Sequence, residues 1–211
     1  MLKGLKANAK TVYILSGAIV LVILVSVVLA GKTSGGNAEV NGIFSRTTAR
    51  IYNDEKVDEK LINTMLQAAF ASPSGGGQYA NEYIVVDDRD VMKQMMEANP
   101  YAQALETAPA VIVIAGNTNN AHYEGLLMFD AGIAAQSIMV EASELGLSSV
   151  PMSIAPSKDR MEAVAAALNL PDGVEAQLMV AIGYPYLDSY TSASVNNYNQ
   201  EEVHYNTWTS R

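Results

Sequence analysis

Beyond residue 42, apolar residues recur at two spacings along the chain. Positions 62, 65, 66, 69 and 70 are apolar at helical spacing, and residues 91–98, 124–145 and 157–168 also read as helices. Apolar runs at residues 83–86, 110–116, 148–154 and 175–185 are typical of strands. Because these elements do not alternate as regular strand–helix–strand units, the pattern predicts an α+β domain.

The predicted helix over residues 124–145 is apolar on most of its sides. A helix of this kind must be covered all round. We therefore expect either its own domain or a partner subunit to bury it.

A second apolar region lies near the N-terminus. Residues 12–30 form a run of 19 residues without a charge, preceded by Lys3, Lys6 and Lys10. Such a run is long enough to cross a bilayer as a helix, and lysines beside it stay in the cytoplasm. The sequence predicts a signal anchor or transmembrane segment at 1–30, a flexible tether at 31–41 and a domain at 42–211 outside the cytoplasm. Cleavage near Ala30, which would release a secreted domain, is the alternative.

Composition excludes several classes of function. The chain has no cysteine and two histidines, His122 and His204, so thiol catalysis is excluded and a zinc or Ser-His-Asp enzyme is a poor fit. All 22 acidic residues but only 10 of the 13 basic ones follow the apolar run, giving −12 beyond it. A surface of that sign repels nucleic acid. We expect neither a metal site nor a nucleic-acid partner.

Candidate chemistry begins with Arg46, Thr48 and Arg50, which alternate. An extended backbone points such side chains the same way. Two guanidiniums and a hydroxyl that converge form an anion site, most naturally for phosphate. The alternative is a solvated edge strand with ordinary surface arginines.

Two further segments could contact a planar ligand. Glycines at positions 75–77 let the backbone approach such a ligand closely, although a plain loop would also use them. Pro151 interrupts the apolar run at 148–154 and could lay its backbone against a ring. An ordinary core strand is the alternative there.

Six motifs in order, over residues 43–208, resemble the nitroreductase family of flavin mononucleotide (FMN) enzymes. They are Arg-x-Thr-x-Arg-x-Tyr from residue 46, Ser-Pro-Ser-Gly from residue 72, and the stretches APAVIVIAG, FDAGIAAQSIMVEASELGL, AIGYP and VHYNTW. The resemblance implies a homodimeric α+β domain, with a mixed sheet flanked by helices and two FMN sites at the subunit interface. Electrons would pass through flavin N5 to a small organic acceptor. The cofactor carries this chemistry, so no catalytic side chain is expected.

The resemblance also implies roles for individual residues. Arg46 and Thr48 would hold the phosphate, Arg50 would face the pyrimidine edge, and the backbone of Met152 and Ser153 would lie by N5. The implied FMN-binding residues are Arg46, Thr47, Thr48, Arg50, Ser74, Gly75, Gly76, Gly77, Tyr79, Pro151, Met152 and Ser153.

The sequence departs from the family at several positions. Gly77 replaces an asparagine, residues 79–81 replace Gln-Pro-Trp, Ser153 stands where glycine is usual, and Asn197 stands where a basic residue is usual. A flavin-free binding or scaffold protein with this fold therefore stays open, as does a relative of the reductive dehalogenases. For a domain outside the cytoplasm, we expect a membrane or extracellular redox carrier as electron donor.

Overall fold

The computed structural model describes residues 42–187, 191–193 and 197–208. The predicted transmembrane segment and tether lie outside these residues. The contacts place the described residues in one unit.

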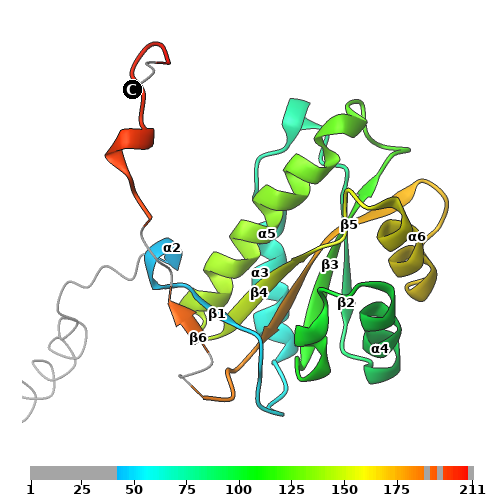
Figure 1. The fold of residues 1–211 in the computed structure, drawn as a ribbon. Coiled ribbons are helices and arrows are strands. Elements are labelled where there is room, and N and C mark those ends of the chain that lie inside the picture. The colour runs from blue at the N-terminus through cyan, green and yellow to red at the C-terminus, as the bar shows by residue number, and fades with distance from the viewer. Residues whose placement is uncertain (1–41, 188–190, 194–196, 209–211) are drawn as a thin grey trace, which may run out of the picture. The chain divides into compact units, whose positions relative to one another are not determined.

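A six-stranded mixed sheet forms the centre of the domain (Figure 1). Only β1 and β4 pair in parallel, and the other neighbouring strands are antiparallel. The four strands expected from apolar runs are confirmed, and the α+β prediction with them. β6 gave no comparable signal in the sequence. In sheet order the strands are β2 (Asn81–Val86), β3 (Ala110–Asn117), β5 (Val174–Gly183), β4 (Ser148–Ser153), β1 (Thr47–Ala49) and β6 (Thr191–Ala193).

Helices cover both faces of this sheet (Figure 1). α3 (Glu59–Phe70) and α5 (Leu127–Glu144) lie on one face, and α4 (Arg89–Ala98) and α6 (Lys158–Ala167) lie on the other. We call these the α5 face and the α4 face. A short helix, α2 (Gly42–Ser45), precedes β1. All four helices expected from the sequence are confirmed, with ends that shift by a few residues.

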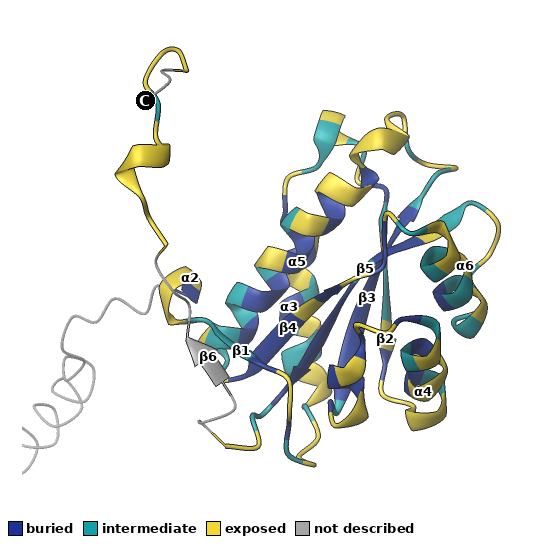
Figure 2. Ribbon diagram, viewed as in Figure 1, coloured by how far each residue is buried: buried dark blue, intermediate teal, exposed yellow. Residues whose placement is uncertain are grey.

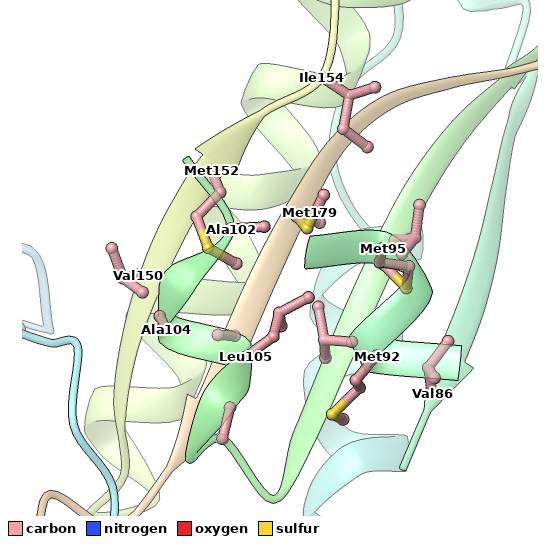
Figure 3. Packing of buried hydrophobic residues seen from close by; sticks show 14 of the residues in the cluster. Val86, Met92, Met95, Ala102, Ala104, Leu105, Val150, Met152, Ile154 and Met179 are labelled. Carbon is pink, nitrogen blue, oxygen red and sulfur yellow. The ribbon is translucent and has the colours of Figure 1, made fainter. Parts of the chain in front are cut away.

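The core divides into two apolar clusters because strand side chains alternate between the two faces. In β3, Val111 and Val113 join the cluster on the α4 face, whereas Ile112 and Ile114 join the one on the α5 face. On the α4 face, methionines from α4, β4 and β5 pack together with the turn at Gln103–Glu106 (Figure 3).

α5 is buried along one side and exposed along the other (Figure 2). Among the described residues, Glu124–Glu144 is the one helix whose length and apolarity would let it cross a membrane, but eight residues of α5 are buried in the domain. It is therefore a core helix. Met128 and Phe129 remain 54% and 60% exposed, so the domain alone does not cover the helix all round.

Candidate functional site

A strip of side chains on the α5 face runs along β1 and β4. Thr48 lies beside Ser149 in the parallel pairing of β1 with β4, and Ser149 is paired with Ile182 of β5. Ile182 belongs to the α5-face cluster. Since strand residues two apart share a face, Pro151 and Ser153 continue the strip, which spans about 13 Å from Ser149 to Ser153.

Polar groups that lack partners gather at one end of this strip. Arg46 Nη1 donates a hydrogen bond to Thr48 Oγ1 at 2.9 Å, so these two side chains converge as expected. Arg46 Nε and the Ser149 hydroxyl are buried and have no hydrogen-bond partner within the described part of the chain. Buried polar groups are nearly always paired. The strip therefore offers unused hydrogen-bonding capacity beside a positive charge.

Two other predicted residues, Thr47 and Arg50, lie outside the β1–β4 strip. Thr47 turns to the opposite face, where its hydroxyl lies 2.6 Å from that of Ser148. Arg50 follows β1 in a bend and is exposed. Burial raises the pKa of the Tyr52 phenol, and the positive charge of Arg50 partly offsets that rise.

The other end of the strip is open to solvent. β4 is an interior strand of the sheet, yet Pro151 and Ser153 are exposed. Met152 between them is buried and points to the α4 face (Figure 3). A ligand lying here on the α5 face would meet the backbone at position 152 and the side chains on either side.

The glycine segment is organised around Asp130, a buried carboxylate on α5. Ser74 Oγ and Gln78 Nε2 donate hydrogen bonds to Asp130 Oδ2 at 2.7 and 3.0 Å, and the Gly75 amide donates to Oδ1 at 2.8 Å. The amide of Tyr79 donates to Ser74 Oγ in turn. One carboxylate thus holds both ends of the turn. We call these residues, Asp130 with Ser74, Gly75 and Gln78, the Asp130 cluster.

The glycines let this turn approach the protein's own chain closely. A Cβ at Gly75 would lie 2.5 Å from Leu126 Cδ1, and one at Gly76 would lie 2.7 Å from the Tyr123 ring. Gly76 and Gly77 also have positive φ angles of 62° and 66°, which favour glycine. The glycine run predicts that the missing side chains leave room for a flavin. At Gly75 and Gly76, Leu126 and Tyr123 lie where those side chains would be. Gly77 meets only its neighbour Tyr79, at 4.0 Å.

A small pocket of about 60 Å³ lies beside the turn, and Asn81 and Tyr83 line it. Asn81 Oδ1 is buried and has no partner in the described residues. Burial raises the pKa of the Tyr83 phenol, a hydrogen bond from Asn81 lowers it, and the charge of Asp130 adds to the rise. The pocket has room for one or two water molecules, which could satisfy the Asn81 oxygen.

One chain does not bring all the predicted residues together. The Asp130 cluster lies at the N-terminal end of α5, whereas α2, which leads into Arg46, contacts the other end, with Ser45 Oγ 3.4 Å from Ser143 Oγ. Thirteen residues of helix between Asp130 and Ser143 correspond to about 20 Å. Arg46, Thr48, Pro151, Met152 and Ser153 thus form one group, and Ser74, Gly75, Gly76, Gly77 and Tyr79 form another.

Three residues of the site were not anticipated. Ser149 and Gln78 are polar residues in unremarkable contexts, and nothing in their spacing singles them out. Asp130 carried a usable signal, since it is a lone charge within an apolar helical stretch.

Asn197, which stands where a basic residue was expected, is exposed.

Comparison with known proteins gives one family. The sequence matches the nitroreductase family over residues 43–99 and 94–184. A protein of Archaeoglobus fulgidus, provisionally named NADH dehydrogenase/NAD(P)H nitroreductase, is 29% identical over 79% of this chain and 96% of its own length. A crystal structure from Bacteroides thetaiotaomicron with the same provisional name is 32% identical, with a TM-score of 0.74, and covers 82% of this chain and 99% of that one. An FMN-dependent nitroreductase of Clostridium difficile is 25% identical, with a TM-score of 0.72 and coverage of 80% and 99%.

Proposed function

The chain belongs to the nitroreductase family of oxidoreductases, and we propose that it binds FMN along the β1–β4 strip and passes electrons to a small organic acceptor. The observation that carries this proposal is that Arg46 Nε and Ser149 Oγ, at one end of the strip, are buried and have no hydrogen-bond partner within the described ranges. A phosphate would supply the missing acceptors. The FMN-dependent relative supports the choice of flavin.

Each residue of the strip has a definite task in this proposal. Arg46, Thr48 and Ser149 bind the phosphate, and the exposed residues Pro151 and Ser153, with the backbone at Met152 between them, support the ring. The spacing of about 13 Å between these ends leaves room for the ribityl chain. Bound flavin supplies the electron transfer itself, and the protein positions the flavin and excludes water.

We further propose that the partner subunit of a homodimer completes the site. The glycine turn lies about 20 Å along α5 from the segment that leads into Arg46, and a second copy could place its own turn beside the phosphate end of the strip. Phe129 on α5 and Phe70 on α3 are more than half exposed, which suits a face buried by a second copy. Light scattering of the purified protein should give the mass of a dimer, and a monomer that retains flavin would contradict this arrangement.

A dehalogenase-like reaction has less support. Between β2 and β3 the chain forms α4 and the turn at Gln103–Glu106. Met92, Met95 and Leu105 of this segment are fully buried in the core. The segment is thus part of the folded domain and is not free to close over a substrate.

Membrane anchoring by residues 1–30, with the domain outside the cytoplasm, stays part of the proposal. The relatives are named for NAD(P)H, whereas a domain outside the cytoplasm would meet other carriers. A reporter fused after Arg211 should be active only outside the cytoplasm.

Anaerobic stopped-flow reduction with NADPH and with a reduced quinol then identifies the electron donor. Faster reduction by NADPH would contradict the proposal that a membrane or extracellular redox carrier is the donor.

Titration with FMN and with riboflavin tests the cofactor proposal. The two ligands share the ring and ribityl chain and differ only in the phosphate. We expect FMN to bind at least tenfold more tightly, because the phosphate makes charge-assisted hydrogen bonds with Arg46. Equal affinities would remove the phosphate site from the strip. Absence of binding by either ligand would favour the flavin-free scaffold.

A further inference from the structure

A cavity of about 640 Å³ lies at the end of the sheet where β5 begins. β4 stops pairing with β5 at Ser153, opposite Leu178, so the first residues of β5 extend past the end of β4. Gln177 O still accepts hydrogen bonds from the amides of Ile154 and Ala155 before the chain turns away. α6 and the segment Glu124–Met128 close the sides of the space that remains.

The walls of this cavity combine apolar side chains with carboxylates. Leu127, Met161, Leu170 and Val174 supply apolar surface, and the amide of the buried Gln177 lies among them. The titratable lining residues are four acids and one base, namely Glu124, Glu162, Asp172, Glu175 and Lys158. At neutral pH the lining therefore carries an excess of negative charge.

The cavity is separate from the β1–β4 strip. It begins at Ala155, two residues beyond Ser153, and is bounded by α6 of the α4 face. Neither Arg46 nor Thr48 contributes to it. Its four carboxylates would repel the phosphate of FMN, so that phosphate is not its occupant.

We propose that this cavity binds an organic cation with an apolar body. Its size falls within the range of about 300–1,000 Å³ that is usual for small-molecule sites. The apolar walls bury the body of such a ligand, while the carboxylates at the exposed positions balance its charge. This inference does not depend on flavin binding.

Calorimetric titration of the purified full-length chain tests the charge preference. The probe is trimethyl(4-phenylbutyl)ammonium, and 4-phenylbutanesulfonate is the control with the same apolar body and opposite charge. We expect the cation to bind about tenfold more tightly than the anion, and this preference to shrink as salt rises because exposed charges are screened. Equal binding, or preference for the sulfonate, would overturn the proposal.

Two substitutions locate the binding. Glu162→Gln removes one lining charge with little change in shape and should weaken cation binding about threefold, as expected for exposed charge pairs. Glu97→Gln on α4 removes the same charge outside the lining and should leave the affinity unchanged. Equal loss in both variants would show only a general effect of net charge and would overturn the site.

Ala165→Phe fills the cavity from α6 with an apolar side chain. It should reduce cation binding at least tenfold while leaving the circular dichroism spectrum as it is in the unsubstituted protein. The unchanged spectrum reports that the variant is folded. Undiminished cation binding in a folded Ala165→Phe variant would place the ligand elsewhere on the chain and overturn the proposal.

Discussion

The two ends of α5 carry polar groups of opposite character. At the N-terminal end, the Asp130 carboxylate is 1% exposed and accepts three hydrogen bonds from the glycine turn. Near the C-terminal end, Arg46 Nε and Ser149 Oγ are buried and have no partner within the described ranges. A satisfied buried network fixes local structure, whereas an unsatisfied one costs stability unless something else binds there. The first end therefore positions a turn, and the second offers the hydrogen-bonding groups on which the proposed phosphate site rests.

The largest effect should follow from Asp130→Asn. This change removes the charge and one acceptor from three donors that are held in place around it. We expect a loss of about 3 kcal/mol in the free energy of unfolding, because hydrogen bonds to charged groups are strong and a buried donor left unpaired is costly. Urea denaturation measures this loss.

Glu141→Gln provides the matched control on the same helix. Glu141 is half-buried, and its side chain takes no part in the Asp130 cluster. Its substitution should change the free energy of unfolding by less than about 0.5 kcal/mol. Similar losses in both variants would mean that the network around Asp130 has no special weight.

A smaller effect, and on a different quantity, is expected from Arg46→Ala. Loss of the guanidinium should weaken FMN binding by about 2 kcal/mol, or roughly thirtyfold, because the phosphate loses a charge-assisted contact. The free energy of unfolding of the flavin-free protein should change by less than about 1 kcal/mol, since Arg46 Nε has no hydrogen-bond partner in the part of the chain that the structure describes.

Arg46→Lys separates charge from geometry in the same measurement. Lysine keeps the charge but lacks the planar fork of donors. We expect it to restore part of the FMN affinity that alanine loses. If Arg46→Ala destabilises the flavin-free protein as much as Asp130→Asn does, the two ends of α5 are alike and the comparison fails.

The sequence supported most of the fold because the hydrophobic periodicity of the core elements is strong. α3, α4, α5 and α6 and the strands β2, β3, β4 and β5 each bury one face or both, and burial leaves a regular pattern. β6 is three residues long at the edge of the sheet, and so short a segment leaves little pattern to read.

The site was only partly accessible from sequence, for a different reason. The alternation of Arg46, Thr48 and Arg50 predicted that the three side chains converge, and the hydrogen bond between Arg46 and Thr48 confirms this for those two alone. Ser149 comes to this place through the parallel pairing of β1 with β4, a contact between residues about a hundred positions apart. The glycine run predicted a close approach but could not identify Leu126 and Tyr123 as the groups approached.

The smallest effects come from one change made at both ends of α5, serine to alanine. Ser74→Ala removes a hydroxyl that donates to Asp130 and accepts from the Tyr79 amide, so it should cost about 1–2 kcal/mol in the free energy of unfolding. Ser149→Ala removes a buried hydroxyl that has no hydrogen-bond partner among the described residues. It should leave the free energy of unfolding unchanged or raise it slightly, because burying a methyl group avoids the cost of an unpaired hydroxyl. With FMN bound, Ser149→Ala should instead lose about 1 kcal/mol of binding free energy, the usual net contribution of one hydrogen bond. Chemical denaturation with and without FMN measures both quantities, and a destabilised flavin-free Ser149→Ala variant would show that this hydroxyl serves the fold rather than a ligand.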